Sequence, residues 1–157
     1  MKINLVTIGN KMPSWVEEGT GEYLKRLPRN FELVITELPL AKRTKSASNI
    51  KKICESEGQS LLKAVPKDQY LIALDEKGRS HSTMSMASRF KEIMESGKDI
   101  SMIVGGPDGL SKECLDAANE IWALSALTLP HTIVRIVVAE QVYRAWSVLN
   151  GHPYHRE

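Results

Sequence analysis

The sequence predicts an α/β protein built on a parallel sheet. Short, mostly apolar runs alternate along the chain with longer runs whose apolar residues recur at helical spacing. The short runs are apolar on both faces, as is typical of parallel strands that helices cover on each side. No repeat, composition break or Pro/Gly/Ser-rich linker divides the 157 residues, so we expect a single domain over residues 1–157.

Strands and helices are expected in alternation. Strands are expected at residues 3–8, 31–38, 70–75, 100–104 and, with a weaker pattern, 121–124. The first helix, over residues 13–27, begins at Pro13, and the second covers residues 49–64. The third, over residues 83–96, has Ser82 as its N-cap and ends at Gly97. A short helix follows Ser111, and a final one covers residues 132–149.

The final helix is apolar around its whole circumference. Ile133, Val137, Val142 and Trp146 illustrate a pattern that leaves no continuous polar face. Such a helix needs cover on every side. It is either a central core helix or a helix whose outer face meets another subunit, and small α/β domains seldom have a core helix at the C-terminus. We therefore expect a homodimer.

The composition excludes several classes of protein. With 42% hydrophobic and 25% charged residues, the chain is neither disordered nor a coiled coil. No apolar run approaches the roughly 20 residues of a membrane span, so we expect no membrane contact. Cys54 and Cys114 stand far apart without C-x-x-C spacing, which indicates neither a disulfide framework nor a thiolate zinc site. These features favour a cytoplasmic protein.

The net charge of +2 does not by itself indicate a nucleic-acid-binding protein. A polyanion would have to bind a local basic patch. The candidate patch is residues 41–45, with Lys51 and Lys52 behind it and Lys25, Arg26 and Arg29 earlier in the chain. Such a run is usually a solvated loop, but it can also serve as an electrostatic footprint for a phosphate backbone.

The sharpest local motif is the glycine-rich segment at residues 104–111. It follows an expected strand and leads into a helix, a place where glycines let a ligand approach the backbone. The spacing of Gly105, Gly106 and Gly109 is not that of the dinucleotide fingerprint, which also belongs after the first strand. A ligand loop and a tight structural turn both remain open on this segment alone.

Two further segments are candidate walls of a ligand site. Residues 124–131 combine apolar side chains with small hydroxyls and end at a Pro-His pair, which fits either an adenine-sized ligand or a buried connection. Asp75 closes the third expected strand, where ligands of open α/β sheets gather, although such residues also cap turns.

The C-terminal tail has an unusual composition for a chain end. It contains His152, Tyr154, His155 and Arg156, groups that can stack on bases, move protons or pair with phosphate. The two histidines could form half a metal site, but no further ligand is recognisable, and we expect no metal. In the helix before the tail, Glu140 and Arg144 have salt-bridge spacing, whereas Arg135 has no such partner and is freer for a ligand.

Taken together, these motifs identify a family. The segments that carry the resemblance are Lys11-Met12-Pro13, Glu22-Tyr23, residues 105–110, residues 125–131, Tyr143-Arg144-Ala145 and residues 152–156. They resemble the ribosomal RNA large subunit methyltransferase H family of the SPOUT class, which methylates N3 of a pseudouridine in 23S ribosomal RNA. The resemblance runs from residue 1 to the C-terminus.

The resemblance implies a fold, a cofactor and a set of site residues. The fold would be a parallel-sheet SPOUT methyltransferase domain with a C-terminal deep trefoil knot, paired in a homodimer. The substrate would be 23S ribosomal RNA within the assembled ribosome, and no metal would be needed. The S-adenosylmethionine site would comprise Leu74, Gly105, Gly106, Leu124, Ser125, Ala126, Leu127, Thr128 and Leu129.

The resemblance assigns Arg144, Tyr154, His155 and Arg156 to the substrate side. Pseudouridine N3 must lose a proton as it attacks the methyl group, and imidazole titrates near neutral pH, so His155 is the best candidate base. The two arginines could stabilise developing anionic charge or hold phosphate, and Tyr154 could orient the base. A non-catalytic ribosome-binding module is the alternative, and a cofactor titration separates the two.

Overall fold

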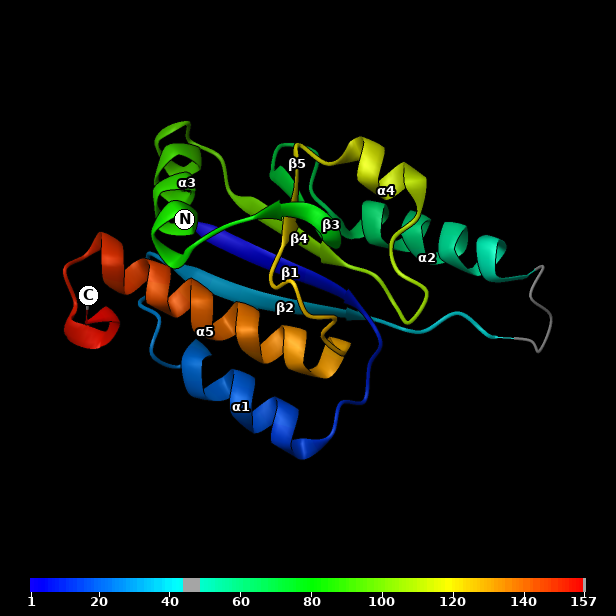
Figure 1. Ribbon diagram of the computed structural model, residues 1–157, viewed down its shortest axis with the longest axis horizontal. Coiled ribbons are helices and arrows are strands. Elements are labelled where there is room, and N and C mark those ends of the chain that lie inside the picture. Colours follow the sequence, from blue (N-terminus) through cyan, green and yellow to red (C-terminus); the bar gives the residue numbers. More distant parts are fainter. Residues whose placement is uncertain (44–48, 157) are drawn as a thin grey trace.

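The computed structural model describes residues 1–43 and 49–156, which form a three-layer α/β structure (Figure 1). Within these residues, five strands make one sheet in the order β2-β1-β4-β3-β5, and every pair is parallel. The strands are β1 (Lys2–Ile8), β2 (Glu32–Leu38), β3 (Tyr70–Ser80), β4 (Ile100–Val104) and β5 (Glu120–Ala123). The prediction of an α/β protein with a parallel sheet is confirmed.

Helices cover both faces of this sheet (Figure 1). They are α1 (Ser14–Leu24), α2 (Ile50–Ala64), α3 (Thr83–Glu95), α4 (Lys112–Ala117) and α5 (His131–Leu149), followed by a 3₁₀ turn, η2 (Pro153–His155). One core cluster joins the sheet to α3 and α5, with residues of α1 packed against it, and the other joins the sheet to α2 and α4. No helix within the described residues combines the length and apolar character needed to cross a bilayer.

The strands are apolar because both of their faces are buried. In β1, Ile3 and Leu5 belong to the core beneath α3 and α5, whereas Val6 and Ile8 belong to the core beneath α2 and α4. Side chains of a strand alternate between faces, so an uninterrupted apolar run supplies both cores. The two-sided cover expected from the sequence is therefore confirmed.

Two element boundaries differ from the sequence prediction by more than one residue. α1 ends at Leu24, because the amides of Arg26 and Leu27 bond three residues back in a tighter turn, as Leu27 N does to the Leu24 carbonyl (3.2 Å). β3 runs beyond Asp75 to Ser80, because Arg79 and Ser80 pair with β5 after an irregularity in the register. Asp75 does not close this strand; its Oδ1 accepts a hydrogen bond from the Lys77 amide (2.9 Å).

The predicted capping residues behave as expected. Ser82 Oγ accepts a hydrogen bond from the Ser85 amide (3.1 Å) at the start of α3, and Gly97 follows the helix with a φ of +74°. Ser111 caps α4 in the same way through the Cys114 amide (3.3 Å). Local sequence signals therefore fixed the starts of both helices.

Candidate functional site

A cavity of about 990 Å³ lies at the carboxyl edge of the sheet. Its walls come from the end of β3, the glycine-rich loop after β4, and the segment between β5 and α5. Because all five strands are parallel, their carboxyl ends meet at one edge, and ligands of open α/β sheets bind there. The residues predicted for the cofactor all line this cavity, except Ala126: Leu74, Gly105, Gly106, Leu124, Ser125, Leu127, Thr128 and Leu129.

The glycine-rich loop is both a tight turn and a cavity wall. The Gly109 amide donates to the Gly106 carbonyl (3.0 Å), and Gly109 has a φ of +80°, which favours glycine. A Cβ on Gly105 would lie 2.5 Å from the backbone of Gly109, so the turn has no room for a side chain there. The reading of a tight structural turn is confirmed, and the reading of a ligand loop stays a prediction, with the loop in the wall of the cavity.

The segment after β5 forms an open wall of the cavity. Leu127 is 74% exposed, so the alternative of a buried connection is wrong. Ser125 Oγ accepts a hydrogen bond from the Leu127 amide (2.9 Å), and Thr128 donates to Glu76 Oε2 across the cavity mouth (3.3 Å). These contacts join the segment to itself and to β3.

The C-terminal tail is organised around one carboxylate. Glu140 Oε1 accepts hydrogen bonds from Arg144 Nη2 (2.6 Å) and from the Tyr154 hydroxyl (3.0 Å). The predicted ion pair between Glu140 and Arg144 is confirmed. Burial, followed by the hydrogen bond to Glu140, raises the pKa of Tyr154 to about 12. Tyr154 therefore remains a neutral hydrogen-bond donor at ordinary pH.

The tail histidines have separate environments. His155 Nδ1 lies 3.3 Å from Ser147 Oγ, whose hydroxyl donates to the Arg144 carbonyl (2.7 Å). His152 packs against Trp146, with ring centroids 5.4 Å apart. Residues 1–43 and 49–156 contain no cluster of three or more His, Cys, Asp or Glu side chains arranged to hold a metal ion.

The C-terminal tail follows the last turn of α5, and the first turn of α5 lies at the other end of that helix (Figure 1). His131 and Val134, in the first turn, line the cavity, whereas η2 follows the last turn. A helix of 19 residues is about 28 Å long. One copy of the chain therefore does not bring the predicted substrate-side residues to the predicted cofactor pocket.

Arg135 is not free for a ligand, contrary to the sequence expectation. Its side chain is 2% exposed, and it donates to the Gly9 carbonyl (2.5 Å) and pairs with Glu37 (3.2 Å). Sequence spacing could not identify either partner, because Gly9 and Glu37 lie more than ninety residues from Arg135 in the sequence. The fold of the parallel sheet brings them close to it. The buried Nε atom has no partner among the described residues.

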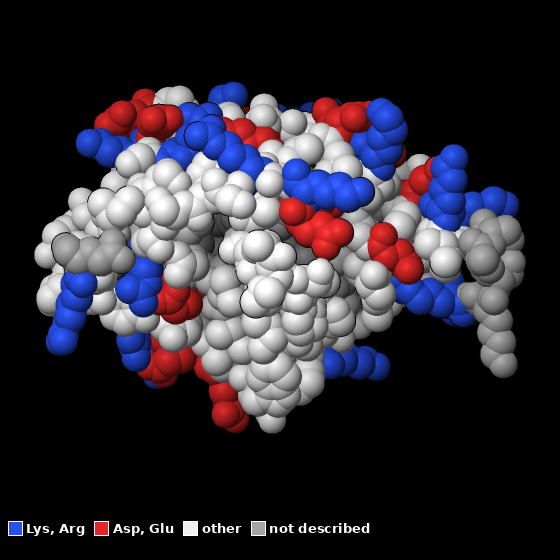
Figure 2. Space-filling model, in the orientation of Figure 1, with Lys and Arg blue, Asp and Glu red and all other residues white. Residues whose placement is uncertain are grey.

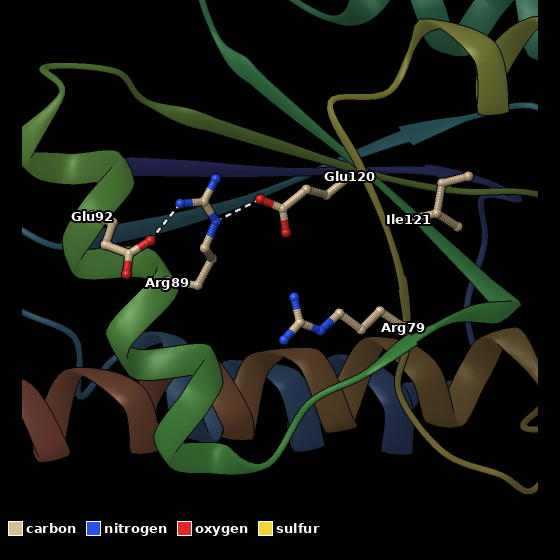
Figure 3. Close-up of a pocket in the computed structure, with 5 residues that line it drawn as sticks. All are labelled: Arg79, Arg89, Glu92, Glu120 and Ile121. Atoms are coloured by element: carbon tan, nitrogen blue, oxygen red, sulfur yellow. Dashed lines mark hydrogen bonds and ion pairs between the residues drawn. The ribbon is translucent and has the colours of Figure 1, made fainter.

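A second, smaller cavity lies between α3 and β5 (Figure 3). Arg89 pairs there with Glu92 and Glu120 (both 2.5 Å), while Arg79 extends from β3 toward the same space. Two cations and two carboxylates balance in charge, so the cavity has no net charge to attract an ionic ligand. We regard it as part of the ion-pair network that joins α3 to the sheet.

Part of the predicted basic patch is paired within the protein. Lys25 and Arg26 both pair with Glu22, which leaves less of their charge for a polyanion. Thr44 and Lys45 lie outside the described residues. Lys42 is exposed, whereas Arg43 pairs with Glu57 and Asp108. Sequence analysis missed these two carboxylates, although both lie at or near the glycine-rich loop.

Comparisons with known proteins agree on one family. Residues 1–155 match the family model described as "Predicted SPOUT methyltransferase". A relative from Thioalkalivibrio sulfidiphilus (strain HL-EbGR7), named ribosomal RNA large subunit methyltransferase H, is 50% identical over 157 residues, covering all of both chains. A relative of the same name from Hahella chejuensis (strain KCTC 2396) is 46% identical, again over the full length of both chains.

A solved structure also resembles this fold. It is a methylase family protein from Neisseria gonorrhoeae, which aligns with a TM-score of 0.52 over 96% of this chain and 93% of its own. At 12% sequence identity, this likeness concerns the fold alone.

Proposed function

The chain belongs to the SPOUT methyltransferase family, among its ribosomal RNA large subunit methyltransferases, and we propose that it uses S-adenosylmethionine to methylate N3 of a pseudouridine in 23S ribosomal RNA. The observation that carries the proposal is the cavity at the carboxyl edge of the sheet, which gathers the predicted cofactor residues from three separate segments. The assembled ribosome is the proposed substrate, which implies a cytoplasmic site of action.

The residues of the cavity fit this cofactor. Leu74, Leu124 and Leu129 offer apolar walls for an adenine ring, and the glycine-rich loop offers backbone close to the ligand. Asp75, Glu76 and Asp108 also line the cavity together with Lys77, so carboxylates outnumber the lysine there and complement a cationic ligand. When bound there, S-adenosylmethionine supplies an electrophilic methyl group on a positively charged sulfur.

His155 is the proposed general base. The Ser147 hydroxyl donates to the Arg144 carbonyl, so its oxygen is left to accept a hydrogen bond from His155 Nδ1. With its proton on Nδ1, the imidazole presents the lone pair of Nε2 to the substrate, where it can accept the N3 proton. Ser147 thus selects the tautomer that a base requires.

Arg144, Tyr154 and Arg156 complete the proposed substrate side. Glu140 holds the Arg144 guanidinium 4.7 Å from the centre of the Tyr154 ring, so the two side chains form one preorganised surface. Tyr154 is a donor and not a base, because its pKa is raised to about 12. Arg156 is exposed at the end of η2, where it can pair with phosphate or developing negative charge.

We further propose that the active site is shared in a homodimer. The tail of one copy would meet the cavity of the other, since α5 separates them within one chain. Ile133, Ile136 and Val137 of α5 are only half-buried, and Trp15 on the neighbouring α1 is 49% exposed. The surface over these two helices is largely uncharged in Figure 2, which favours contact with a second copy.

A trefoil knot is the proposed path of the chain around the cavity. A Cβ on Gly78 would lie 2.7 Å from the backbone of Ile121 and Trp122, so β3 and β5 are in backbone contact beside the pairs that Arg79 and Ser80 make with β5. This contact brings the chain that leads into α3 next to the chain that continues into α5. It supports a threaded arrangement, which general rules of topology disfavour.

Titration calorimetry and methyl transfer test the proposed function. The wild-type protein should bind S-adenosylmethionine without added metal and should transfer labelled methyl to ribosomes faster than to protein-free RNA. No binding would exclude the methyltransferase proposal and favour a ribosome-binding module. Equal rates on ribosomes, isolated subunits and free RNA would remove the assembled ribosome as the preferred substrate.

Mixing two inactive variants tests the shared site. His155→Ala and Gly106→Val would each disable one half of every site in a homodimer. If the halves come from different copies, subunit exchange should restore about a quarter of the wild-type sites, because half of the dimers then contain one intact pair. A site contained within one chain would give no recovery.

A further inference from the structure

Arg43 joins three segments at the outer side of the glycine-rich loop. Its Nε donates to Asp108 Oδ2 (3.3 Å), and its Nη1 donates to Glu57 Oε1 (3.1 Å) and to the Ala41 carbonyl (3.2 Å). Its Nη2 lies 3.2 Å from Asp108 Oδ2 and 3.5 Å from Glu57 Oε2. All three guanidinium nitrogens are therefore engaged within the protein.

Glu57 is a buried anchor for this arginine. The side chain extends from α2, is 3% exposed, and also accepts a hydrogen bond from the Ala41 amide (3.1 Å). Arg43 is its cationic partner among the described residues. A buried carboxylate is costly unless a cation and hydrogen-bond donors satisfy it, so Glu57 holds Arg43 and the backbone of Ala41 in place.

The ion pair of Arg43 and Glu57 contacts the glycine-rich loop on the side that faces away from the cavity. A Cβ on Gly106 would lie 2.8 Å from Glu57 Oε2 and 3.2 Å from Arg43 Nη2, so the loop backbone rests directly on these two side chains. The Cys54 thiol, also on α2, donates to the Asp108 carbonyl (3.3 Å). One side of the loop thus faces the cavity and the other side contacts Arg43 and Glu57.

We propose that Arg43 is a positioning residue that holds Asp108 and the glycine-rich loop in the conformation that binds S-adenosylmethionine. This inference rests on the proposed function. It divides the basic segment by role: Arg43, although 31% exposed at its side chain, is paired with the carboxylates of Glu57 and Asp108, whereas the neighbouring Lys42 is exposed and available for RNA phosphate.

Cofactor affinity in matched variants tests the proposal. Arg43→Ala should raise the Kd and the KM for S-adenosylmethionine about tenfold while kcat at saturating cofactor is retained. Arg43→Lys should recover part of the loss, since an ammonium cannot bridge both carboxylates. Lys42→Ala, which removes the same charge from the next residue, should leave cofactor affinity unchanged.

A double-mutant cycle keeps the test decisive. Glu57→Gln keeps the size of the side chain that anchors Arg43 and does not line the cavity, and adding it to Arg43→Ala should cost little more than either change alone. If Arg43→Ala does not fold, the cofactor affinity of Glu57→Gln decides. Unchanged affinity in a folded variant, or an equal loss in Lys42→Ala, would overturn the role of Arg43. A wild-type protein that binds no cofactor would instead overturn the proposed function.

Discussion

The two ends of α5 are built by different means. At its first turn lies a cavity whose shape depends on backbone: strand ends, a glycine turn and a loop. At its last turn lies a group of side chains arranged around Glu140, half-buried and open on one side. The first end borders the cavity of about 990 Å³, whereas residues 152–156 at the second end line neither of the two cavities described above.

This difference is what the proposed division of the site would require of a small domain. Close packing of parallel strands fixes a pocket, because the strand ends must meet at one edge of the sheet. Side chains at a chain end have fewer neighbours, so hydrogen bonds must orient them instead. Glu140 and Ser147 provide that orientation for Tyr154, Arg144 and His155. Variants at each end should therefore have separable effects.

His155→Ala should produce the largest effect, and only on the chemistry. If His155 accepts the N3 proton, the rate of methyl transfer in a single turnover should fall by roughly 10² to 10⁴. Cofactor affinity, measured by calorimetry, should be unchanged, because the cavity lies at the other end of α5. A wild-type rate with an unaltered pH profile would assign deprotonation to water or to an RNA group.

Arg135→Met should have the largest effect on stability. The change leaves the Gly9 carbonyl and the Glu37 carboxylate without their buried partner at the start of α5. We expect the free energy of unfolding to fall by about 2–4 kcal/mol. The loss is smaller than for a fully buried ion pair, because Glu37 is one-third exposed. Denaturant titration measures it.

A double variant distinguishes the ion pair from general packing. Glu37→Gln alone should also destabilise the protein, because it leaves the buried Arg135 charge without a carboxylate. Combined with Arg135→Met, it should add less than its separate effect. Strict additivity would show that the two residues act independently of each other.

Gly106→Ala should weaken cofactor binding by a smaller amount. The new Cβ would lie 2.8 Å from Glu57 Oε2, so either the loop or the carboxylate must move. We expect about a tenfold loss of affinity with little change in the rate at saturating cofactor. Gly21→Ala is the matched control, because a Cβ at that position in α1 meets nothing within 4 Å. Equal behaviour of the two variants would separate Gly106 from the cofactor site.

The sequence predicted the elements well because their signals are local. Apolar periodicity marked the strands and helices, and Ser82 and Gly97 marked the ends of α3. The extension of β3 was missed because the charged residues after Leu74 do not look like a strand. Pairing with β5, and not local propensity, keeps that segment extended.

The sequence predicted several segments of the candidate site, but it did not predict how these segments contact one another. Motifs resembling a known family marked the glycine-rich loop and the residues after β5 that line the cavity. The contacts of Arg43 with Glu57 and Asp108, and of Arg135 with Gly9, join residues distant in sequence. No spacing rule reveals such partners. The separation of the tail from the cavity likewise depends on the length and direction of α5.

Tyr154→Phe should give the smallest effect and should report on the tail alone. Because the pKa of Tyr154 is raised from its ordinary value of about 10 to about 12, folding favours the protonated phenol. The folded state then binds more protons than the unfolded state between these two pH values, so the contribution of Tyr154 is fully present below about pH 10 and is lost as the pH rises toward 12. Tyr154→Phe lacks this titration.

Thermal unfolding of both proteins from pH 8 to 12 should therefore show a stability difference that favours the wild type and shrinks at the alkaline end. Burial also raises the pKa of Tyr70, but that residue is present in both proteins, so its effect cancels in the comparison. A difference that stays constant with pH would mean that Tyr154 is neither buried nor held by Glu140 in solution as it is in this structure. The tail would then lack the internal order that distinguishes it from an ordinary chain end, and its residues would need the ribosome to arrange them.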